Sequence, residues 1–291
     1  MLQRSSRRPK AEAINGHGRC NGMKHWTLDD IPWDHFEPSK ADGDLLAVVR
    51  TASLVERNAA DYATYLCNVF PDDPGFQAAA RTWAEEEAQH GEALGRWAEM
   101  AGAGFDFREA FRRFTEGYRI PVESSASVRG SRWAELVARC VVESGTSSFY
   151  SALRDASDEP VLRDICRRIA GDEFRHYRLF YDNLQRYLAR ERPWRARRLL
   201  IACGRFFEVG DDELSFAYHC ANEPDAPYVR AKANEAYTRR ASRYYRRSHV
   251  QRAMGMILKA SGVDPAGWLG TMATHLAWRH VQRRQRLPLA A

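Results

Sequence analysis

Two Glu-x-x-His motifs, each set in the middle of an apolar helical stripe, constrain the fold of this chain more than any other feature. The first motif is Glu87 and His90, and the second is Glu173 and His176. Apolar residues recur on both sides of each motif at steps of three and four, which is the spacing of one face of an α-helix. Each motif therefore places a carboxylate and an imidazole on a face that a globular helix buries.

Two further glutamates complete an internal repeat. Glu56 lies on an apolar stripe 31 residues before Glu87, and Glu143 lies on another stripe 30 residues before Glu173. The two halves thus repeat one layout at an offset of 86 or 87 residues. The repeat predicts two similar helical hairpins, each with one glutamate on its first helix and one Glu-x-x-His motif on its second.

Helical periodicity dominates the rest of the chain, and no alternating strand pattern is present, so the sequence predicts an all-α fold. We expect four long helices over about 42–68, from the turn at 71–74 to about 100, over 131–156 and over 160–191, with a short helix near 107–115. Short turns within each pair and a long link between the pairs give two antiparallel hairpins joined by a crossover. This connectivity is that of a ferritin-like four-helix bundle.

The expected organisation has three parts. Residues 1–25 form a flexible N-terminal tail, residues 26–192 form the four-helix bundle, and residues 193–291 form a helical extension packed on the bundle. The extension should contain additional C-terminal helices over about 195–207, 211–222, 229–260 and 265–283.

The four glutamates and two histidines predict a metal centre. A buried carboxylate without a partner loses its hydration, so four of them in one core would oppose folding unless cations neutralised them. Two divalent cations balance four carboxylates, and oxygen and imidazole ligands suit iron or manganese. Such a site is known in four-helix bundles. The predicted ligands are Glu56, Glu87, His90, Glu143, Glu173 and His176.

These motifs resemble those of the soluble acyl-acyl-carrier-protein (acyl-ACP) desaturases, within the ferritin-like di-iron oxidoreductases. The similarity covers roughly residues 42–187. A Trp followed by Glu-Glu-x-x-His-Gly is matched by Trp83, Glu86, Glu87, His90 and Gly91. Asp-Glu-x-Arg-His is matched by Asp172, Glu173, Arg175 and His176, and Glu-x-x-Thr is matched by Glu143 and Thr146.

The resemblance implies an enzyme that holds two iron ions and uses O2 and an external electron donor to oxidise a C–H bond. Its implied substrate is an acyl chain on an acidic carrier protein. Thr146 would deliver a proton or hydrogen-bond a bound oxygen species, or it only bonds to carbonyls of its own helix. Asp172 would accept the outer N–H of a liganding histidine and fix its tautomer, or it is a solvated acid.

Other functions share these six ligands. They occur in tRNA hydroxylases, in multicomponent hydrocarbon monooxygenases and in the small subunit of ribonucleotide reductase, so a hydroxylase of tRNA or of a small molecule is one alternative. A non-catalytic ferritin-like protein that binds or oxidises iron is another. The net charge of +6 and the arginine clusters within 186–198 and 239–247 suit an acidic partner, whether a carrier protein or RNA.

Composition also bears on compartment and assembly. No apolar run approaches the roughly 20 residues of a membrane-spanning helix, and the first residues lack the apolar segment of a secretory signal. The six cysteines are scattered, which favours reduced thiols in a cytoplasmic protein. A helix containing Tyr237, Tyr244 and Tyr245 is a candidate homodimer contact or lid.

Overall fold

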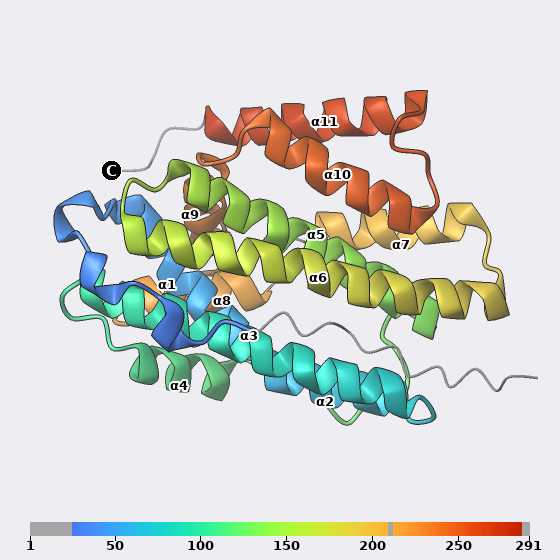
Figure 1. Cartoon of the computed structure of the whole chain (residues 1–291), viewed down its shortest axis with the longest axis horizontal. Helices are drawn as coiled ribbons and strands as arrows, with labels where there is room; N and C mark the ends of the chain where they lie inside the picture. The colour runs from blue at the N-terminus through green and yellow to red at the C-terminus, as the bar shows by residue number, and fades with distance from the viewer. Residues whose placement is uncertain (1–24, 209–211, 287–291) are drawn as a thin grey trace, which may run out of the picture.

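The computed structural model describes residues 25–208 and 212–286, and these residues form helices and no strand. The all-α prediction is therefore confirmed over the described ranges. Short 3-10 turns at Leu28–Asp30, Trp33–His35 and Pro38–Lys40 precede the first α-helix. The helices (Figure 1) are α1 (Gly43–Arg57), α2 (Ala59–Val69), α3 (Pro74–Ala101), α4 (Phe107–Gly117), α5 (Arg132–Ala156), α6 (Pro160–Glu191), α7 (Arg195–Phe207), α8 (Asp212–Asn222), α9 (Arg230–Ser242), α10 (Arg247–Ser261) and α11 (Trp268–Gln285).

The long helices are arranged as two hairpins. Helices α1 and α2 pack in succession along α3, and α5 packs along α6. Short connections, residues 70–73 and 157–159, join the members of each hairpin. The link over 102–131, which contains α4, returns the chain along the length of the molecule, so that α3 and α5 run in the same direction (Figure 1). Contacts between α3 and α6 bring the two hairpins together.

Side-chain caps fix where the long helices begin. In each case a carboxylate or hydroxyl oxygen accepts a hydrogen bond from a backbone N–H of the first turn, which would otherwise lack a partner. The capping residues are Asp42, Asp73, Ser131 and Glu159. Pro74 and Pro160 occupy the first position of α3 and α6, where a proline costs no hydrogen bond. These are local signals, and they explain why the predicted starting points agree with the structure.

The first predicted helix, over 42–68, is wrong in one respect, because Asn58 divides it into α1 and α2. The break coincides with a very close approach of two backbones. A Cβ atom added to Gly91 of α3 would lie 2.6 Å from the backbone nitrogen of Arg57 and 2.8 Å from its Cα. The contact between these two segments is a tertiary feature, so helical periodicity alone does not reveal the bend.

The helix predicted over 229–260 is also divided, into α9 and α10. Helix α9 packs on α1 and α8, whereas α10 packs on α5. Arg240 and Arg243 both form ion pairs with Asp44 at the start of α1, and these pairs hold the end of α9 there. The chain must change direction after this anchor to reach α5. Tyr237 therefore lies on α9, while Tyr244 and Tyr245 lie in the turn that follows.

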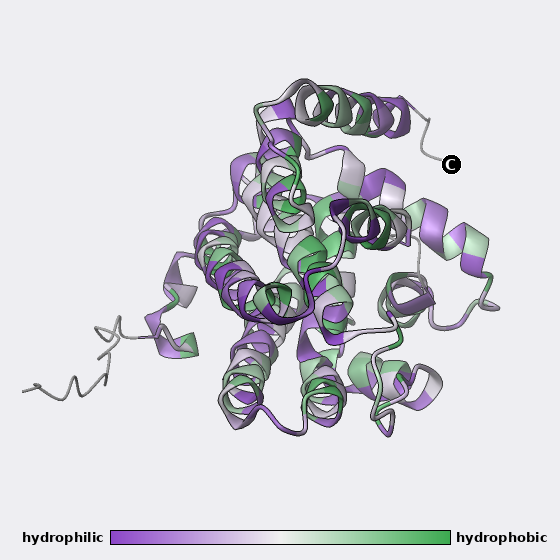
Figure 2. Cartoon of the chain, turned by 90° about the vertical axis from the view of Figure 1, so that its right-hand side faces the viewer, coloured by the Kyte–Doolittle hydropathy of each residue, from purple (hydrophilic) through white to green (hydrophobic). Residues whose placement is uncertain are grey.

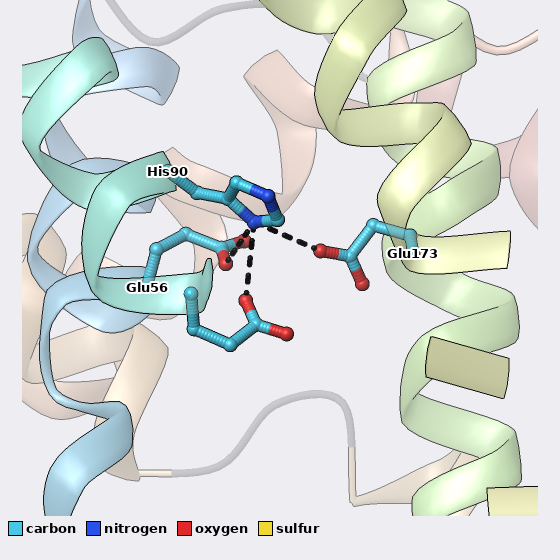
Figure 3. Close-up of side chains that lie close together, drawn as sticks. Glu56, His90 and Glu173 are labelled. Atoms are coloured by element: carbon cyan, nitrogen blue, oxygen red, sulfur yellow. Dashed lines mark ion pairs between the residues drawn. The ribbon is translucent and has the colours of Figure 1, made fainter. Parts of the chain in front are cut away.

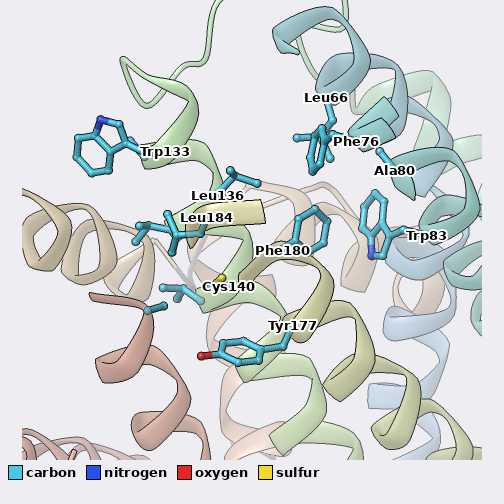
Figure 4. Packing of buried hydrophobic residues seen from close by; sticks show 14 of the residues in the cluster. Leu66, Phe76, Ala80, Trp83, Trp133, Leu136, Cys140, Tyr177, Phe180 and Leu184 are labelled. Atoms are coloured by element: carbon cyan, nitrogen blue, oxygen red, sulfur yellow. The ribbon is translucent and has the colours of Figure 1, made fainter. Parts of the chain in front are cut away.

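Two apolar clusters fill the interior, one toward each end of the long helices. The first contains Phe76, Trp83 and Phe180, whose rings face one another (Figure 4). The second contains Leu94 and Trp97 of α3 with residues of α1, α5 and α6. Apolar residues accordingly concentrate where the helices face one another, and hydrophilic residues on their outer faces (Figure 2). On all four long helical segments, the predicted ligands fall between the two clusters.

The C-terminal helices add a partial outer layer. Helices α7 and α10 pack on α5, α8 packs on α1, and α11 packs on α9 and α10. None of the helices within the described ranges is long and apolar enough to cross a membrane. The tail predicted over residues 1–25 lies outside the described residues except for His25.

Candidate metal centre

The structure brings all six predicted ligands together at mid-height between the two hairpins. Helix α1 contributes one glutamate, α5 contributes another, and α3 and α6 each contribute one Glu-x-x-His pair. None of the six is more than 8% exposed. The spacing of three residues places the glutamate and histidine of each motif on one helix face, as the periodicity requires.

The ligand atoms form two overlapping groups. Within each group all of the candidate ligand atoms lie within 4.8 Å of one another. One group is Glu56, Glu87, His90 and Glu173, and the other is Glu87, Glu143, Glu173 and His176. Glu87 and Glu173 belong to both groups, each carboxylate having two oxygens. The two groups could therefore hold two cations, with three carboxylates and one imidazole available to each and with Glu87 and Glu173 available to both.

Each histidine turns its Nδ1 atom toward the carboxylates. His90 Nδ1 lies 3.7 Å from a carboxylate oxygen of Glu56 and 3.4 Å from one of Glu173 (Figure 3). It also lies 3.4 Å from a carboxylate oxygen of Glu87. His176 Nδ1 is 3.0 Å from Glu87, and the centres of the two imidazole rings are 5.8 Å apart. The ring nitrogens and the carboxylates thus face a common centre.

The outer Nε2 atom of each histidine meets an acid from the opposite motif. His90 Nε2 lies 3.0 Å from Asp172 Oδ2, and His176 Nε2 lies 2.7 Å from Glu86 Oε2. An acid on one ring nitrogen fixes the proton there and leaves the other nitrogen as a lone-pair donor. Both histidines therefore present Nδ1, the nitrogen available to a cation, toward the centre. Asp172, predicted as such a partner, occupies this position on His90.

Several polar atoms at the centre lack a partner. Among the described residues, four buried atoms of the site have no hydrogen-bond partner, namely His90 Nδ1, His176 Nδ1, Glu143 Oε1 and Glu173 Oε1. Buried polar atoms in folded proteins are almost always paired, because an unpaired one costs about 1–3 kcal/mol. Cations held by the two ligand groups would give all four atoms a partner. The residues present thus fit a pair of divalent metal ions.

The electrostatics of the carboxylates agree with that fit. Burial raises the pKa of Glu56 and of Glu143 well above the usual range, and neighbouring carboxylates raise it further. Burial would lower the pKa of His90, but the nearby carboxylates of Asp172 and of the surrounding glutamates raise it instead. Added positive charge at the centre would therefore favour the ionised form of Glu56 and Glu143.

Thr146, the other predicted catalytic residue, touches the centre from α5. Its hydroxyl contacts Glu173 Oε2 and lies 3.3 Å and 3.2 Å from the carbonyl oxygens of Val142 and Glu143. The residue is only partly buried. Thr146 therefore combines the helical back-bond with a direct contact to one candidate bridging carboxylate.

Three neighbours of the site were not assigned roles from the sequence. Glu86 could have been found, because it precedes Glu87 as Asp172 precedes Glu173 in the repeat. Tyr150 donates a hydrogen bond of 2.5 Å to Glu56. Trp26 stacks on His90, with ring centres 5.9 Å apart, and donates to Asp172 at 2.7 Å. Nothing in the sequence signals the contact of Trp26 with a helix more than sixty residues away.

Comparison with known proteins adds no relative: no family model and no curated protein matches this chain. The buried carboxylates and imidazoles lie close enough together to bind metal ions.

Proposed function

We propose that this protein is a ferritin-like di-iron oxidoreductase that uses O2 to oxidise a C–H bond of an organic substrate, as the acyl-ACP desaturases do. The observation that carries the proposal is the pair of overlapping ligand groups that share Glu87 and Glu173. Two metal ions bound by these groups would suit a reaction in which O2 takes up more than one electron.

The chemistry of the ligands favours iron or manganese over a structural zinc. The two ligand groups contain carboxylate and imidazole but no thiolate. Cys140 lies one helical turn before Glu143, and burial raises the pKa of its thiol well above the usual range, so it stays protonated. Two ferrous ions would supply the electrons for reducing O2, and an external donor would restore them.

The protein's own residues would shape this site in three ways. Asp172 and Glu86 orient the two histidines through their outer ring nitrogens. The apolar clusters at both ends of the long helices limit access of water. The Thr146 hydroxyl holds Glu173 from the partly exposed side of α5, where it can also donate a hydrogen bond to a reacting group.

Some of the arginines predicted to bind an acidic partner already form ion pairs with acids of the same chain. In the second arginine cluster, Arg240 and Arg243 are paired with Asp44. In the first, Arg186 lies 3.0 Å from Asp73. An acidic carrier protein would therefore meet chiefly the remaining arginines on the end of α6 and on α7.

The test is to purify the protein without oxygen, load it with ferrous iron, count the bound metal and measure O2 uptake. We expect about two irons per chain by the ligand count, and O2 uptake that depends on them. Glu143→Ala should bind less metal and lose O2 uptake, whereas Glu85→Ala, on the exposed side of α3, should match the wild type. Binding of fewer than two metal ions by the wild type would contradict the proposal. Oxidation and retention of added iron in large excess would instead favour the ferritin-type function.

A further inference from the structure

One buried arginine, a helical turn from the candidate metal centre, has no counter-ion among the residues that the structure describes. Arg139 of α5 is 8% exposed, and its Nε atom is fully enclosed. Within the described ranges, Arg139 forms no hydrogen bond, and no carboxylate oxygen lies within 4.0 Å of its nitrogens. Its guanidinium carbon lies 5.0 Å from the ring centre of Tyr62 and 6.0 Å from that of Trp83. Arginine is almost never buried unless it is paired, because its charge loses hydration.

A second unpaired donor lies beside it. The indole Nε1 of Trp83 is buried and has no hydrogen-bond partner among the described residues. Trp83 itself is 5% exposed and faces the Arg139 guanidinium. An indole N–H can only donate, and a guanidinium has five N–H groups and accepts nothing. The pair therefore lacks an acceptor, and an acceptor bearing negative charge forms the strongest hydrogen bonds with arginine.

Two acids of this region, Glu135 and Glu213, lie more than 4.0 Å from the Arg139 guanidinium nitrogens and accept hydrogen bonds from other residues. Glu135, one turn before Arg139 on α5, accepts hydrogen bonds from Tyr65 at 2.8 Å and Ser127 at 2.7 Å. Glu213 of α8 accepts one from Tyr62 at 2.7 Å. The charge of the metal ligands is balanced separately, since two divalent cations neutralise four glutamates. Among residues 25–208 and 212–286, Arg139 therefore has no acid as an ion-pair partner.

Each of the two donors lies one helical turn before a candidate metal ligand. Arg139 precedes Glu143 by one helical turn, and Trp83 precedes Glu87 by one turn, which is about 6 Å along each helix. Val142 and Thr146 follow Arg139 on the same face of α5, and both are partly exposed. Thr146 in turn contacts Glu173. A small molecule held at Arg139 would thus extend along this face to the centre.

We propose that Arg139 and Trp83 bind the carboxylate of a small organic acid, and that the hydrocarbon part of this acid is the group oxidised at the metal centre. This substrate class rests on the proposed function. It differs from a carrier-bound acyl chain, whose carboxyl group is a neutral thioester and offers no charge to a guanidinium. The distance of about one helical turn between the donors and the ligands selects acids of roughly the length of hexanoate or benzoate.

The test compares charged and neutral probes of the same shape. Hexanoate with hexanamide, and benzoate with benzamide, are titrated by calorimetry into metal-free protein and into iron-loaded protein under argon. We expect each acid to bind at least about tenfold more tightly than its amide, which is the lower range for a charged hydrogen-bonded pair. Arg139→Gln should abolish this preference and leave the affinity for the amide unchanged. Trp83→Phe, which removes only the N–H, should reduce the preference by a smaller factor.

Arg178 provides the matched control for Arg139. Arg178→Gln removes an exposed arginine of α6 and should keep the full preference. If circular dichroism shows that Arg139→Gln does not fold, the test uses Arg139→Lys and Trp83→Phe instead. We expect each of these variants to lose part of the preference for the acid over the amide. Any of three results would overturn the proposal: the wild type binds acid and amide with equal affinity, the variants keep the preference for the acid, or no acid binds at about 10 mM. A preserved acid preference in a chain that binds no metal would instead count against the di-iron function alone.

Discussion

Glu86 of α3 lies 2.7 Å from the outer ring nitrogen of His176 on α6, and Asp172 of α6 lies 3.0 Å from that of His90 on α3. Each acid directly precedes the metal-site glutamate of its own helix and contacts the histidine of the other helix. The two contacts therefore connect the hairpins reciprocally, and the internal repeat of the sequence becomes a pseudo-symmetric pair of interactions around the centre.

Removal of one of these acids should weaken metal binding without removing a ligand. Glu86→Ala leaves the His176 ring free to rotate and to change tautomer, so we expect a 10- to 100-fold loss of metal affinity. Competition with a chelator of known affinity measures it. The neighbouring Glu85→Ala, on the exposed side of the same helix, is the control and should bind metal as the wild type does. Equal affinities for the two variants would show that Glu86 does not support the histidine.

Glu143→Gln should change stability in opposite directions with and without metal. In the metal-free chain it replaces a carboxyl group whose ionisation is opposed by burial and by neighbouring carboxylates, so the melting temperature should stay equal or rise. In the loaded chain it removes a ligand and should reduce the stabilisation by metal, which amounts to about 4 kcal/mol at a thousandfold excess over the dissociation constant. Thermal melts with ferrous iron and with a chelator measure both effects. A variant destabilised equally in both states would argue that Glu143 has only a packing role.

Two helical glycines should respond oppositely to alanine. At Gly91 an added Cβ would lie 2.6 Å from the backbone of Arg57, beside the ligand Glu56, so Gly91→Ala should cost about 1–3 kcal/mol and lower metal affinity. At Gly145 an added Cβ meets no atom within 4 Å, so Gly145→Ala should stabilise the helix by up to about 1 kcal/mol. Denaturant unfolding of both variants measures the difference. A neutral Gly91→Ala would mean that α1 and α3 can separate at no cost.

Asp73 should stabilise the fold in a pH-dependent manner. It caps α3 through the N–H of Phe76 at 3.1 Å and binds Arg186 at 3.0 Å, and these contacts outweigh burial and hold its pKa below the usual 3.8. A lowered pKa gives stability that is present above the unfolded value and is lost as the pH falls through the folded value. Asp73→Ala should therefore cost about 1–2 kcal/mol near pH 7 and progressively less below pH 3.8.

Chemical denaturation at several pH values measures this effect. The adjacent Asp72→Ala is the control, because Asp72 is exposed and its ion pair with Arg132 should contribute less than about 1 kcal/mol. A penalty at Asp73 that does not change with pH would assign the effect to packing and not to the carboxylate charge.

Local pattern alone determined much of this protein. Residues three and four apart share a helix face whatever the rest of the chain does, so the stripes around Glu87 and Glu173 predicted the helices, their buried sides and the polar layer across them. The caps at Asp73 and Glu159 act within one turn, so the starts of α3 and α6 could also be predicted. The ferritin-like and di-iron assignments, which rest on the repeat, stay proposals.

Only the tertiary structure decided which distant groups meet. The bend at Asn58 beside Gly91, the division of α9 from α10, the stacking of Trp26 on His90 and the unpaired Arg139 depend on contacts between segments far apart in the sequence. A periodic pattern states which face of a helix is buried but not which neighbour covers it. The neighbour follows from the simultaneous packing of all helices, so these features appeared only in the folded chain.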